Sequence, residues 1–139
     1  MNNLSHLIVS KIEHGNLLEE QGKTEEALSL YLSVWKDLDN LEDKKYEAEE
    51  TRWLINCIYE SYISLNDYET AKKWAEDIFN CKIPENGTSE LIDLGKIYYE
   101  LGEKNKSFDL FLKAYKKGKE RAFKEYNPKY LKFLKTHNN

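Results

Sequence analysis

The sequence has few residues that interrupt helices and few that form disulfides or bind metals. Its 139 residues include two prolines, six glycines and two cysteines. Scarce proline and glycine favour helices over sheets and turns. Cys57 and Cys81 are isolated and have no CxxC spacing, so we expect reduced cysteines that pack in the interior of a cytoplasmic protein.

Long apolar runs are absent as well. No stretch approaches the roughly 20 residues that cross a bilayer, and residues 1–6 show no basic segment followed by an apolar one. We therefore expect neither a membrane span nor a secretory signal. With 40% hydrophobic and 33% charged residues, the chain fits one soluble globular domain over residues 1–139.

Motifs for catalysis are missing too. The chain has no glycine-rich phosphate loop, HExxH, zinc-ligand spacing or nucleophile elbow. His6 and His14 would lie roughly 12 Å apart on a helix, too far for one metal ion. The adjacent acids Glu19–Glu20 and Glu49–Glu50 point in different directions on a helix, so we expect solvated faces. His137 is expected in a frayed tail. We predict a protein that is not an enzyme and needs no cofactor or metal.

Charge is distributed unevenly along the chain. The net charge of −4 is the sum of −7 over residues 1–50, −4 over residues 51–100 and +7 over residues 101–139. Such polarity affects the choice of partner more than the fold. The basic third could complement the acidic end within the chain, or head to tail between copies.

A ladder of small and aromatic residues recurs three times at constant spacing. A small or aromatic residue comes first, a glycine or asparagine follows seven positions later, and an alanine or serine follows five after that. The first copy contains Gly15, Leu18, Gly22, Ala27 and Tyr31; the second Tyr59, Tyr62, Asn66, Ala71 and Ala75; the third Gly95, Tyr98, Gly102, Ser107 and Phe111.

This ladder resembles the tetratricopeptide repeat. The resemblance places repeats at residues 8–41, 52–85 and 88–121, with Tyr59 and Asn66 in place of the usual glycines. It implies an all-α fold, in which three antiparallel helix pairs form a right-handed superhelix that binds another protein.

Packing explains the residue types of the ladder. Gly15 and Gly95 let the second helix of a pair approach closely. Gly22 and Gly102 end the first helix in a left-handed conformation that carries no Cβ penalty, and Asn66 is the best substitute for glycine there.

Two segments extend the repeats. The stretch from Leu41 to Leu65 lacks glycine and proline, so we predict one lengthened helix with Glu42–Glu50 projecting beyond the repeats. After Gly118 we expect a helix over roughly Glu120–Tyr126 and a short helix from Pro128, which suits a first turn. Together they form a C-terminal cap at about residues 120–135, whose apolar face comprises Phe123, Tyr130, Phe133 and Leu134.

The resemblance also implies a concave groove formed by the first helix of each pair. The family's groove positions give the candidate partner-binding residues Asn16, Glu19, Glu20, Trp53, Asn56, Glu60, Lys96, Tyr99 and Glu100. Ile12 replaces a lysine that the family's chaperone-tail clamp requires, which excludes that ligand. Acids around aromatic anchors suit a basic protein. The alternative is that these are ordinary solvated faces.

The segment from Asn127 to Phe133 is similar to the ends of bacterial immunity proteins that neutralise toxins, many of which are basic nucleases. The resemblance therefore implies an immunity protein that binds a basic toxin domain. The alternatives are a co-chaperone or scaffold module, or a regulatory protein that binds peptides or nucleic acid. Lysines with interleaved aromatics in the basic third favour nucleic acid, but the acidic remainder would repel phosphate.

Overall fold

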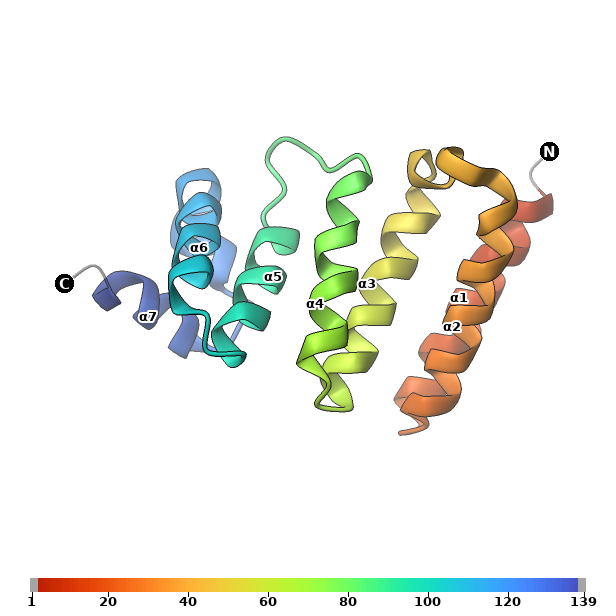
Figure 1. Ribbon diagram of the computed structural model, residues 1–139, viewed down its shortest axis with the longest axis horizontal. Helices are drawn as coiled ribbons and strands as arrows, with labels where there is room; N and C mark the ends of the chain where they lie inside the picture. The colour runs from red at the N-terminus through yellow and green to blue at the C-terminus, as the bar shows by residue number, and fades with distance from the viewer. Residues whose placement is uncertain (1–2, 138–139) are drawn as a thin grey trace. The chain divides into compact units, whose positions relative to one another are not determined.

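A computed structural model describes residues 3–137, without the side chains of residues 3–5, 42 and 43. Every regular element in this range is helical (Figure 1). This confirms the all-α prediction. The chain divides into two compact units, Met1–Lys82 and Ile83–Asn139. The expectation of one domain over the whole chain stays a prediction.

Unit 1 contains two helix hairpins and two short 3-10 segments. In chain order these are α1 (Asn3–Glu20), α2 (Thr24–Leu38), η1 (Asp39–Glu47), α3 (Glu49–Ser64), α4 (Tyr68–Asp77) and η2 (Ile78–Asn80). Helix α1 packs on α2, α3 packs on α4, and both α1 and α2 contact α3. The core between them is built mainly from aliphatic side chains around the fully buried Tyr31.

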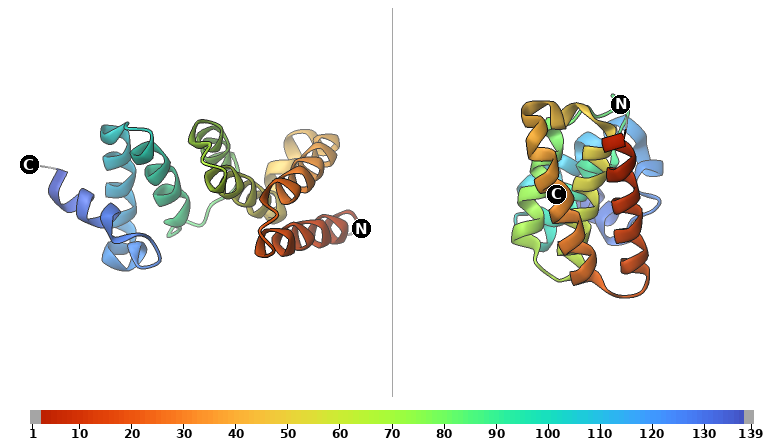
Figure 2. Two further views of the ribbon diagram at one scale, coloured as in Figure 1. Left: turned by 90° about the horizontal axis from the view of Figure 1, so that it is seen from below. Right: turned by 90° about the vertical axis from the view of Figure 1, so that its right-hand side faces the viewer.

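Unit 2 contains a third hairpin and a cap. Its elements are α5 (Ser89–Glu100), α6 (Lys104–Gly118), η3 (Lys119–Phe123) and α7 (Pro128–His137). Helices α5 and α6 pack closely, and α7 packs on α6 and η3. Figure 2 shows α7, in dark blue, running obliquely to α6. The core is aromatic, with Phe111, Phe123 and Tyr130 buried.

The three hairpin turns confirm the predicted left-handed positions. Gly22, Asn66 and Gly102 have φ of 79°, 63° and 85°. In each turn the residue after this position donates its backbone N–H to the carbonyl five residues earlier, at 2.8–2.9 Å. These bonds satisfy carbonyls that the helix end leaves unpaired.

The predicted close approach within helix pairs is confirmed at Gly15 and Gly95. A Cβ on Gly15 would lie 2.3 Å from Cε1 of Tyr31, and one on Gly95 would lie 2.7 Å from the ring of Phe111. The first and third repeats therefore have the same contact, a glycine of the first helix against a ring of the second.

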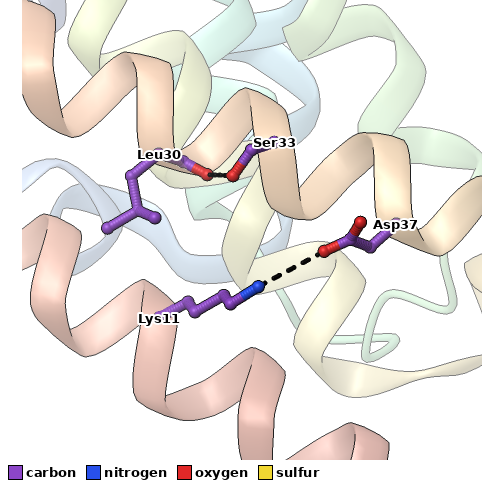
Figure 3. Close-up of polar contacts among 4 residues, drawn as sticks. All are labelled: Lys11, Leu30, Ser33 and Asp37. Carbon is purple, nitrogen blue, oxygen red and sulfur yellow. Dashed lines mark hydrogen bonds and ion pairs between the residues drawn. The ribbon is translucent and has the colours of Figure 1, made fainter.

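The polar contacts on the surface of the α1–α2 pair contribute less to stability than the packing of Gly15 against Tyr31. Lys11 Nζ on α1 lies 3.4 Å from Asp37 Oδ2 on α2, and the Ser33 hydroxyl donates to the Leu30 carbonyl oxygen at 2.7 Å. Figure 3 shows both contacts. Both ionic side chains are about half exposed, and such pairs add only about 0–1 kcal/mol.

The prediction of one lengthened helix from Leu41 to Leu65 is wrong. The chain forms η1, reaches an extended residue at Ala48 (φ −85°, ψ 137°), and only then begins α3. Tyr46 explains this path, because its hydroxyl donates to Asp77 Oδ2 on α4 at 2.8 Å. The backbone of residues 42–50 therefore includes a 3-10 segment tied to α4, rather than a projecting helix.

The expected helix at roughly Glu120–Tyr126 is confirmed only in part, because a 3-10 helix covers Lys119–Phe123 and ends before Tyr126. The chain forms η3 there, because Lys119 adopts a positive φ of 56° that ends α6. The start of the last helix at Pro128 is confirmed. His137 is the last residue of α7 rather than part of a frayed tail. Its ring lies 4.7 Å from that of Phe133 and 5.1 Å from that of Phe108.

Candidate protein-binding surface

Asn16 and Glu19 on α1 belong to a polar cluster inside unit 1. The Tyr31 hydroxyl donates to Asn16 Oδ1 at 2.6 Å and lies 3.2 Å from Glu19 Oε2. The Cys57 thiol is 3.5 Å from the same Asn16 oxygen, and the Ser61 hydroxyl is 3.0 Å from Glu19 Oε1. Glu19 is therefore half-buried between three helices, and the expectation of a solvated face is wrong for it.

Burial keeps the hydroxyl and the thiol of this cluster protonated. Burial raises the pKa of Tyr31 far above its usual range, and the nearby Cys57 and Glu19 raise it further. Burial likewise raises the pKa of Cys57 to about 11. Both groups thus remain neutral hydrogen-bond donors near neutral pH, and the cluster joins α1 to α2 and α3.

Trp53, Asn56 and Glu60 lie on one face of α3. Their spacing of three and four residues brings them onto neighbouring turns, and all three side chains are half-buried. Trp53 packs against the core of unit 1. Asn56 Nδ2 donates to the Tyr59 hydroxyl at 2.9 Å. We call these three residues the α3 stripe.

Glu20 differs from Glu19, because its side chain is exposed on α1. Within unit 1 the structure therefore separates the candidates into three groups. Asn16 and Glu19 hold helices together, the α3 stripe presents partly open side chains, and Glu20 faces solvent.

Tyr99 of α5 is taken up by the cap of unit 2. Its ring packs edge-on against Tyr130 and Phe133 of α7, with centroids 5.3 and 5.1 Å apart. The ammonium group of Lys104 lies 3.3 Å from the Tyr99 centroid. Tyr99 is thus a packing residue of unit 2 as well as a groove candidate.

Lys96 and Glu100 contact the same C-terminal segment. Lys96 Nζ is 5.8 Å from the Tyr126 ring centroid. Glu100 Oε2 accepts from the Tyr130 hydroxyl and pairs with Lys129 Nζ, both at 2.8 Å. Burial opposes ionisation of Glu100, but these hydrogen bonds and the charge of Lys129 outweigh it and lower its pKa.

Sequence reasoning missed a hollow between η3 and α7. It has a volume of about 520 Å³. Its lining includes the apolar Phe123, Pro128 and Leu131, which we call its floor, and Lys124, Lys132 and Lys135, which we call its rim. Glu120, Tyr126 and Thr136 complete the lining. We call this hollow the cap groove. The sequence signal was Leu131, which lies beside Lys132 and four residues before Lys135.

Among the side chains that the structure describes, no group of three or more from His, Cys, Asp or Glu is placed to hold a metal ion. Within residues 3–137, no helix has both the length and the apolar character required to cross a membrane.

Comparison with protein-family models gives no match for this chain, and comparison with curated proteins gives none either. The resemblance to the tetratricopeptide repeat therefore stays a prediction. It is based on the recurring ladder of residues.

Proposed function

We propose that this chain is a non-catalytic, cytoplasmic protein-binding module of the tetratricopeptide type, and that it neutralises a basic partner such as a bacterial toxin domain. The α3 stripe is the observation on which the proposal depends. In this proposal the helix pairs of both units belong to one right-handed superhelix.

The chemistry of the α3 stripe suits a basic protein. Trp53 offers a large, partly open aromatic surface that a partner can cover, and Glu60 places a carboxylate two turns further along the same face. Buried aromatics supply much of the affinity at interfaces, whereas charges at the rim mainly steer association.

The charge of unit 1 supports the same partner. Residues 1–82 contain 17 acids and nine bases, a net charge of −8. A field of this sign attracts a basic protein over distances up to about 10 Å at 0.1 M salt. Cys57 and Cys81 are buried and are not joined by a disulfide, which is compatible with a reducing compartment.

The first experiment identifies the partner. The tagged chain is used to capture proteins from its host, and the product of a neighbouring gene is tested directly for binding. We expect a basic protein that forms a stoichiometric complex and loses its toxicity. An acidic partner, or a nucleic acid, would contradict the proposal.

The second experiment tests the stripe with that partner. W53A should mainly speed dissociation, by about 2 kcal/mol if Trp53 is a hot spot. E60K should mainly slow association and flatten its dependence on salt. E76K is the matched control, because it makes the same charge change at an exposed position on α4. If E60K and E76K have equal effects, only the overall charge of unit 1 matters and the stripe is not the site.

A further inference from the structure

Helix α1 presents two separate leucines to solvent. Leu7 and Leu17 are 55% and 54% exposed, the two most exposed large hydrophobic residues in the described part of the chain. Ser10, His14 and Leu17 follow Leu7 by three, seven and ten residues, so the four side chains share one face of the helix. We call these four residues the outer face of α1. Covering Leu17 with an apolar surface of a partner would remove its side chain from water, which is favourable.

Acids border this outer face. Glu13 and Glu20 are exposed and lie seven residues apart on one side of it. Lys11, on the opposite side, is paired with Asp37 at 3.4 Å. The outer face thus combines two protruding leucines with two carboxylates, in a unit whose net charge is −8.

The cap groove has the complementary chemistry. Its floor is apolar, with Phe123 only 4% exposed beneath it. Of its three rim lysines, Lys135 is paired with Glu120, and Lys124 and Lys132 are exposed. Unit 2 contains eight acids and 12 bases, a net charge of +4.

We propose that the cap groove of one copy binds the outer face of α1 of a second copy. Leu17 fills the apolar floor, while Glu13 and Glu20 face Lys124 and Lys132. The two surfaces are different, so the interface is heterologous, and a head-to-tail dimer as a whole still leaves one groove and one outer face open. The protein therefore associates head to tail, independently of the basic partner proposed above.

Sedimentation velocity and light scattering of the purified full chain test this directly. We expect the average mass to rise with concentration and to fall as salt is added. L17R places a cation against the lysine rim, and K124E/K132E reverses the charge of that rim. All three sites are exposed or half exposed, so both variants should keep the helix content of the wild type. Each should weaken self-association by roughly tenfold or more.

A mixture of the two variants is the decisive measurement. L17R retains an intact groove and K124E/K132E retains an intact outer face, so a 1:1 mixture should associate although each variant alone stays monomeric. K113E/K116E is the matched control, since it makes the same charge change at exposed positions on α6 and should associate like the wild type. A monomeric wild type, a K124E/K132E variant that still dimerises alone, or a mixture that stays monomeric would each overturn the proposal.

Discussion

Replacing Gly15 by alanine should destabilise unit 1, although alanine is the better helix former. The new Cβ would lie 2.3 Å from Cε1 and 2.8 Å from Cζ of Tyr31. Carbon atoms in contact are normally about 3.5 Å apart, so the ring or the helix must move by about 1.2 Å. Tyr31 is fully buried, so its ring has little room to yield.

The expected cost follows from three contributions. Overpacking of this kind costs about 1–3 kcal/mol. Displacing the ring also weakens its 2.6 Å hydrogen bond to Asn16, at about 1 kcal/mol. Alanine recovers up to about 1 kcal/mol through its helix propensity. We therefore expect a net loss of about 1–3 kcal/mol, and a loss of about 2 kcal/mol lowers the urea midpoint by about 1 M.

Urea unfolding followed by circular dichroism measures this loss. S10A is the control, because Ser10 is an exposed residue of the same helix and should change the midpoint little. Y31L removes the ring, so adding G15A to that variant should be neutral or slightly stabilising. A G15A midpoint equal to the wild type, or the same loss in both backgrounds, would refute the close approach of α1 to Tyr31.

Three further outcomes are expected. A71L should overpack the fully buried site of Ala71 and lower the unfolding free energy by about 1–3 kcal/mol in the same assay; no loss would show that the site has space. Because folding lowers the pKa of Glu100, the contribution of this side chain to the free energy of unfolding is present above its unfolded pKa and is lost as pH falls through its folded pKa. E100Q should therefore make the stability of the protein less sensitive to acid. An unchanged pH profile of stability would exclude the pairing of Glu100 with Lys129. C81S leaves one thiol, that of Cys57, which is buried and has a pKa of about 11. We expect this thiol to react with an aromatic disulfide reagent at pH 8 only after urea unfolds the protein. Rapid reaction in the native protein would contradict its burial.

Local chemistry made the helix pairs predictable. Gly22, Asn66 and Gly102 each occupy a turn position that requires positive φ, a demand that residue type reveals directly. Gly15 and Gly95 were predictable for a similar reason. Only a residue without a Cβ permits the ring contact found at both sites.

The resemblance to the tetratricopeptide repeat predicted which residues belong to the candidate site. It did not predict which of them hold helices together and which are open to a partner. The family's positions selected Asn16, Glu19 and Glu60 without distinguishing them. The hydrogen bonds of Asn16 and Glu19 to residues 12 to 42 positions away made them structural. A helical spacing cannot show which of two adjacent acids faces a neighbouring helix.

Tertiary contacts decided the remaining segments. Helix propensity favoured a continuous helix from Leu41 to Leu65, but Tyr46 bonds to Asp77, 31 residues away. Rings of Phe108 and Phe133 likewise hold His137 in α7. The cap groove is lined by residues of η3 and α7 and of the turn between them, and α6 ends before η3 where Lys119 adopts positive φ. Each outcome depends on groups distant in sequence, whose packing and hydrogen-bond energies exceed the few tenths of a kcal/mol per residue by which helix propensities differ.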